Sequence, residues 1–183
     1  MSSEKIRQLV LDAMLAAMCA VLGFAALDFQ NIKLTFEGFP IIVGALLFGP
    51  LDGFAIGAVG IFVYQVIRYG ITATTVLWIL PYALSGLLLG FIAKKQKFDI
   101  SGKRMLVILI INELLITAMN TGAIFVDSKM YGYYHTAIIT GMLAQRLVIS
   151  LVKGAAFGLL MPAILKPVRK LIAQQNNNKA RRT

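Results

Sequence analysis

The positive charges of this chain are gathered into three clusters, which are separated by long apolar stretches. Thirteen of the 18 Lys and Arg residues lie at the N-terminus, between residues 94 and 104, and after residue 165. Basic clusters that flank membrane spans stay on the cytoplasmic side of the membrane. All three clusters then face the same side, so an even number of spans must separate each cluster from the next.

The composition favours a membrane protein over a soluble globule. Hydrophobic residues make up 58% of the 183 residues and charged residues only 14%, whereas a soluble domain carries about 25% charged residues. The net charge of +10 could also suit a nucleic-acid-binding protein, but the cations flank apolar spans instead of lining one face. We therefore expect a multi-pass protein of the cell (plasma) membrane, in contact with the lipid bilayer and without nucleic acid.

One apolar stretch, residues 38–67, is too long to be a single span. As one helix it would measure about 45 Å, against a hydrocarbon core of about 30 Å. Gly49-Pro50 is a strong turn signal in its middle, and Asp52 would be costly inside lipid. A break at Pro50 also restores the charge rule, because it places residues 94–104 on the cytoplasmic side.

These arguments predict an all-α integral membrane protein with six transmembrane helices and cytoplasmic N- and C-termini. Residues 1–172 form a single domain, and residues 173–183 form a basic, polar cytoplasmic tail. The second span is too short to cross the membrane alone, so we expect it to rely on neighbouring helices. The expected spans are residues 8–27, 38–49, 51–67, 72–93, 105–126 and 141–165.

The sequence offers little for catalysis. It has one His and one Cys, so no His/Cys ligand set for a metal can form. It contains no phosphate-binding loop of the Walker type, so we expect it not to hydrolyse ATP itself. Because acid–base groups are scarce, we expect no catalytic residues, no metal and no cofactor in this chain.

Charged and amide side chains inside the expected spans are the stronger signal, since such groups usually face a bundle interior or a cavity. Glu113 and Lys153 lie at similar depth on the last two spans, and so do Asn120 and Arg146. In one interpretation, Glu113 and Lys153 form a buried structural ion pair. In the other, Arg146, Asn120 and Lys153 line a cavity open to the outer face, which would suit a carboxylate or phosphate.

Further candidates lie towards the outer ends of the spans. Aromatic side chains beside a few hydrogen-bonding groups are the usual composition of a small-molecule site. The aromatic residues would equally suit an interfacial belt at the membrane surface. The candidates are Glu37, Gln65, Arg68, Trp78 and Tyr82.

The first span carries Ala13 and Ala17, four residues apart, near its cytoplasmic end. Small residues at this spacing make a flat helix face on which another helix can pack closely. Packing within this chain and docking of a partner helix explain the pattern equally well.

Four stretches together resemble the S component, the substrate-binding membrane subunit, of energy-coupling factor (ECF) vitamin transporters. The first span has a basic start followed by Ala13-x-x-x-Ala17. The likeness covers residues 5–170. The other three stretches are FPIIVGALLFGPLDGFAIGAVG, LWILPYALSGLLLG and RLVISLVKGAAFGLLMPAILKP.

The resemblance implies a six-helix subunit that binds a water-soluble vitamin with high affinity at the outer face. It also implies docking, through Ala13 and Ala17, on a transmembrane coupling protein (the T component) with two ATPase subunits that bind the ATP. Where the family often has Asp on its third helix, this chain has Gln65 and Arg68. The ligand contacts implied by the family are Glu37, Arg68, Trp78, Asn120, Arg146 and Lys153.

The charges of these candidates favour an anionic vitamin, because Arg68, Arg146 and Lys153 outnumber Glu37. Pantothenate and folate-like compounds are the first expectations. The alternative function is a stand-alone small secondary transporter or channel. Such a protein commonly contains inverted repeats, and the sequence shows no repeat of that kind.

Overall fold

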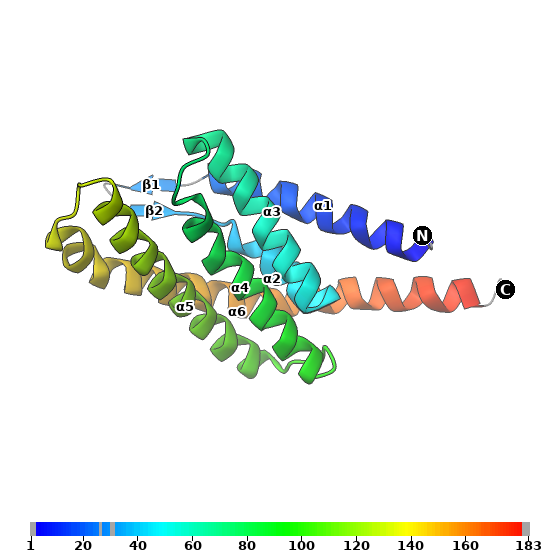
Figure 1. Ribbon diagram of the computed structural model, residues 1–183. Coiled ribbons are helices and arrows are strands. Elements are labelled where there is room, and N and C mark those ends of the chain that lie inside the picture. Colours follow the sequence, from blue (N-terminus) through cyan, green and yellow to red (C-terminus); the bar gives the residue numbers. More distant parts are fainter. Residues whose placement is uncertain (1–2, 26, 30–31, 181–183) are drawn as a thin grey trace.

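The computed structural model describes residues 3–25, 27–29 and 32–180. This part of the chain folds into a bundle of six helices with a short antiparallel ribbon between the first two (Figure 1). The elements in order are α1 (Ser3–Phe24), β1 (Leu27–Phe29), β2 (Ile32–Leu34), α2 (Gly38–Phe48), α3 (Pro50–Tyr69), α4 (Thr75–Lys95), α5 (Gly102–Met130) and α6 (Thr136–Ala180).

The two ends of the bundle differ in the way that the charge rule requires. Both chain termini and the α4–α5 connection lie at one end, and the ribbon and the α5–α6 connection lie at the other (Figure 1). The basic residues 94–104 therefore share an end with both termini, and the charge rule assigns this end to the cytoplasm. The all-α membrane fold expected from the sequence is confirmed, with the two-stranded ribbon as an addition.

In the described part of the chain, five helices are long and apolar enough to cross a membrane, and α2 is a shorter apolar helix. Its 11 residues rise only about 16 Å, roughly half of the hydrocarbon core. It packs against α1, α3, α4 and α6, and Ile41, Ile42, Ala45 and Leu46 are at most 1% exposed. Because α2 occupies only the cytoplasmic half, its first residue, Gly38, lies deep inside the bundle.

The turn between α2 and α3 depends on Gly49, whose φ of 115° is a conformation that other L-residues rarely adopt. Pro50 follows as the first residue of α3, where its missing N–H costs no helical hydrogen bond. The position of a Cβ on Gly49 would lie 3.8 Å from the Phe98 ring, so this turn lies beside the α4–α5 connection. The break inferred at Pro50 is thus at the cytoplasmic end.

Several helix ends differ from the expected span boundaries. The sixth helix extends from Thr136 to Ala180 and continues through Pro162 and Pro167, although we expected a span of 141–165 followed by a separate tail. The last turns of a helix outside the bilayer need not be apolar, so hydropathy alone does not locate this end. Helix α4 also contains an internal proline, Pro81, and continues through it without a break.

Glycines allow α3 and α4 to approach at backbone distance. A Cβ on Gly86 would stand 2.1 Å from the carbonyl oxygen of Gly53, and one on Gly90 would stand 2.3 Å from the Cα of Pro50. Real Cβ atoms cannot take such positions, so the spacing between these two helices requires glycine. This close contact lies below the outer half of the bundle, where α3 and α4 carry the residues of the site described next.

We expect Gly86→Ala to lower stability by about 1–3 kcal/mol, because the new methyl group would force two packed backbones apart. In a protein of this size, each kcal/mol corresponds to roughly 2–4 °C in Tm, measured by thermal unfolding in detergent. Gly122→Ala is the matched control, since a Cβ there meets nothing within 4 Å. Equal Tm values for the two variants would contradict this account of the α3–α4 contact.

Candidate substrate-binding site

A cavity of about 650 Å³ lies within the outer half of the bundle. Its wall is built by the segment before α2, by α3, α4, α5 and α6, and by the α3–α4 and α5–α6 connections. The exposed rings of Tyr131 and Tyr133 form part of its rim. Of the residues proposed from the sequence, the cavity brings together Glu37, Gln65, Trp78, Tyr82, Asn120, Arg146 and Lys153.

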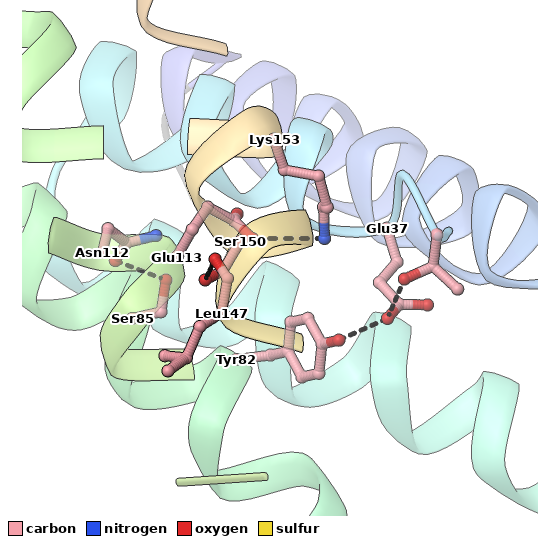
Figure 2. A network of polar contacts seen from close by, with 9 residues as sticks. Glu37, Tyr82, Ser85, Asn112, Glu113, Leu147, Ser150 and Lys153 are labelled. Atoms are coloured by element: carbon pink, nitrogen blue, oxygen red, sulfur yellow. Dashed lines mark hydrogen bonds and ion pairs between the residues drawn. The ribbon is translucent and has the colours of Figure 1, made fainter. Parts of the chain in front are cut away.

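Glu37 reaches the inner wall because it directly precedes the half-length helix α2. It is 5% exposed, and its Oε1 accepts hydrogen bonds from the Tyr82 hydroxyl and from Thr35 Oγ1, the latter at 2.9 Å (Figure 2). Its Oε2 is buried without a partner in the described part of the chain. A carboxylate is costly to bury unless it is hydrogen-bonded. The two hydrogen bonds that Glu37 accepts offset part of this cost and hold its side chain in place.

Asn120, on α5, lines the same cavity as Glu37 and Tyr82. The Oδ1 atom of Asn120 is buried without a partner among the described residues. A carboxylate before α2, a tyrosine hydroxyl on α4 and an amide on α5 therefore all line the cavity.

A buried ion pair forms the opposite part of the inner wall. Lys153 Nζ on α6 lies 3.2 Å from Glu113 Oε2 on α5, with the two side chains 11% and 3% exposed (Figure 2). The prediction that these residues share a depth is confirmed. The sequence left two interpretations open, a buried ion pair and a cavity lining. The structure shows both, because Glu113 and Lys153 are paired and also line the cavity.

Asp127 connects two loops at the outer rim, and the sequence analysis did not propose it. Its carboxylate accepts hydrogen bonds from the Thr74 hydroxyl, at the start of α4, and from the Tyr133 hydroxyl, after α5. The hydrogen bond to Asp127 raises the pKa of Tyr133 to about 12, so this phenol keeps its proton at neutral pH. An acidic residue in the last turn of α5, directly after the expected span of residues 105–126, was the available signal.

Arg68 is the one proposed binding residue that the structure does not bring to the cavity. Its Nε donates to the Tyr69 hydroxyl at 3.2 Å, and its guanidinium carbon lies 5.6 Å from the centre of that ring. Tyr69 itself lines the cavity. The position of Arg68 near the end of α3 was foreseeable, but the direction of its side chain was not.

The charge balance of the cavity therefore differs from the one expected. The lining contains the carboxylates of Glu37, Glu113 and Asp127 and the cations of Arg146 and Lys153. Arg146 is half-buried on α6, and no carboxylate pairs with it in the part of the chain that the structure describes. With Lys153 paired to Glu113, Arg146 is the lining cation left to meet an acidic ligand group.

Helix α1 presents two different alanine faces. Ala16 and Ala20 are 6% and 5% exposed and pack within the bundle, where the backbone of Ala16 lies beside Gly60 of α3. Ala13 and Ala17 are exposed on the outside of the bundle. Packing within this chain therefore does not account for the second pair.

The described helices thus form a six-helix bundle with a cavity towards its outer end and exposed small residues on its first helix. Residues 7–168 match the family described as "ECF transporter, substrate-specific component". The chain belongs to this family of membrane transport proteins, and it is not an enzyme.

The chain is also similar to a curated relative and to two solved structures. A "UPF0397 protein" of Streptococcus agalactiae serotype Ia is 26% identical over 161 residues, which cover 86% of this chain and 87% of the relative. The fold is similar to that of FolT crystallised with folic acid, with a TM-score of 0.62, 21% identity, and coverage of 82% of this chain and 88% of the other. It is also similar to the S-component for biotin from an ECF-type ABC transporter, with a TM-score of 0.64, 17% identity, and coverage of 93% and 95%.

We expect Lys153→Met to destabilise the protein by about 3–5 kcal/mol, because it leaves the buried Glu113 carboxylate without its counter-charge. The double variant Lys153→Met/Glu113→Gln should recover most of this loss, since neither charge remains. Thermal unfolding in detergent measures both effects, and Lys103→Met, at an exposed position on α5, is the control for loss of one lysine. A single variant as stable as the control would show that the pair is unimportant for folding.

Proposed function

We propose that this protein is the high-affinity S component of an ECF-type ABC importer and that it captures a water-soluble vitamin at the outer face of the membrane. The observation that carries the proposal is the cavity itself, which joins a polar and aromatic wall to an outer rim in a bundle of the S-component family. Its volume lies in the range of about 300–1,000 Å³ that small-molecule sites occupy.

The proposed partners are a transmembrane coupling protein, the T component, and two ATPase subunits that bind and hydrolyse ATP. The exposed Ala13 and Ala17 support this part, because a flat helix face is suited to close contact with a helix of the coupling protein. The absence of a Walker-type loop from the sequence is consistent with an energy source in another subunit.

For the ligand, we propose a vitamin with an acidic group that pairs with Arg146. Folate-like compounds and pantothenate both carry such a group. Among the structural neighbours, the FolT structure holds folic acid and the other neighbour is an S-component for biotin. With Arg68 outside the cavity and three carboxylates in its wall, the ligand must also supply hydrogen-bond donors rather than negative charge alone.

Transport assays test the proposal directly. The chain should bind a vitamin when purified alone, and cells or proteoliposomes should accumulate that vitamin only when the coupling protein and both ATPases are present. Mass spectrometry of compounds retained on purification from rich medium identifies the ligand. Accumulation at an undiminished rate without the ATPases would instead support a stand-alone transporter.

Ala13→Trp and Ala17→Trp should each abolish uptake while leaving the Kd for the vitamin unchanged, because the added bulk blocks helix docking and neither residue lines the cavity. Leu159→Trp is the control, since it places a tryptophan at an exposed position of α6. Uptake and binding are measured on the same preparations. Normal uptake by both alanine variants would remove α1 as the docking face.

A further inference from the structure

The aromatic residues in the cavity wall are tyrosines and a tryptophan, without phenylalanine. Among the described residues, the lining holds the only tryptophan of the protein and five of its six tyrosines, and no phenylalanine, although the chain has 11. A tyrosine offers a flat apolar face together with a hydrogen-bonding hydroxyl. A wall of such rings matches a planar ring that itself carries polar atoms. The residues are Tyr64, Tyr69, Trp78, Tyr82, Tyr131 and Tyr133.

A buried amide belongs to the same wall. Gln65 on α3 is 9% exposed, lines the cavity, and has no hydrogen-bond partner among the described residues. A primary amide presents a donor and an acceptor side by side, which pair with adjacent acceptor and donor atoms on the edge of a nitrogen heterocycle. Because the Gln65 side chain lines the cavity, an occupant with such an edge can pair with its amide.

Arg146 lies on a different side of the cavity. It projects from α6, which packs on α5 and α2, whereas Gln65 and Trp78 come from α3 and α4, which pack on each other. The polar end that Arg146 can bind is therefore separate from the ring that Gln65 and Trp78 can bind. A single ligand that uses all three residues must carry an acidic group away from its ring.

We propose that the substrate is a planar nitrogen heterocycle that carries a carboxylate or phosphate at a distance from the ring. The ring lies against the α3–α4 wall, where Gln65 reads its polar edge and Trp78 stacks on its face. The acidic group pairs with Arg146. This inference rests on the proposed function, and it separates the two ligands suggested by charge alone, because folate-like compounds have such a ring and pantothenate has none.

The single tryptophan makes the test direct, because the fluorescence of Trp78 reports occupancy of this cavity and no other site. The purified full chain, freed of retained compounds, is titrated with folic acid, pterin, pantothenate and biotin, with calorimetry as a second readout. Pterin has the heterocycle without the distant acid, whereas pantothenate and biotin have an acid without an aromatic ring. We expect folic acid to bind at least about tenfold more tightly than each of the other three, the scale of one charged hydrogen bond.

Two variants test which residue binds the acidic group of the ligand and which binds its ring. Arg146→Met should reduce the preference for folic acid over pterin to less than about threefold, because only folic acid loses a partner. Gln65→Leu should weaken folic acid and pterin by a similar factor of about ten, since both lose the same ring contact. Trp78→Phe removes the fluorescence signal and confirms its source.

The possible failures are distinguishable. Pantothenate or biotin binding as tightly as folic acid, or a retained compound without an aromatic ring, would overturn the ligand class and leave the importer function intact. An unchanged preference for folic acid in Arg146→Met would also overturn the inference. Failure of all four probes to bind, together with no vitamin uptake in the complete transporter, would contradict the proposed function itself.

Discussion

The half-length helix α2 is the constraint on which the rest of the structure depends. With 11 residues it fills only the cytoplasmic half of the bundle, so the chain before it enters at mid-depth and carries Glu37 to the inner wall of the cavity. The helix is buried on several sides, and Arg169 of α6 donates a hydrogen bond at 3.2 Å to the Leu46 carbonyl near its end. A carbonyl there would otherwise lack a partner within the helix.

The charged groups at mid-depth serve the fold and the cavity together. A buried ion pair is weak evidence for stability by itself, because two charges must leave water. Here Glu113 and Lys153 also join α5 to α6 and form part of the wall. At the rim, Asp127 connects the α3–α4 and α5–α6 connections through Thr74 and Tyr133. The helices that hold the site are therefore joined by the same side chains that define it.

Helix α1 links the two proposed working surfaces of the protein. Its exposed alanines, Ala13 and Ala17, lie near the middle of the helix, while Gly23, near the outer end, lies against Glu37 and Tyr64. A Cβ on Gly23 would stand 2.8 Å from the Tyr64 ring and 3.1 Å from Glu37 Oε2. One helix thus contributes both to the proposed docking face and to the support of a cavity carboxylate.

The sequence by itself determined the topology, because the basic clusters and apolar lengths define how often the chain crosses the membrane and which end faces the cytosol. It also determined the depth of Glu113 and Lys153, since position along a helix follows from a rise of about 1.5 Å per residue. Only the tertiary structure decided that Arg68 turns to Tyr69 and that Asp127 bridges two loops. Side-chain direction and loop pairing depend on how helices rotate and pack against one another, and neither apolar periodicity nor charge count contains that information.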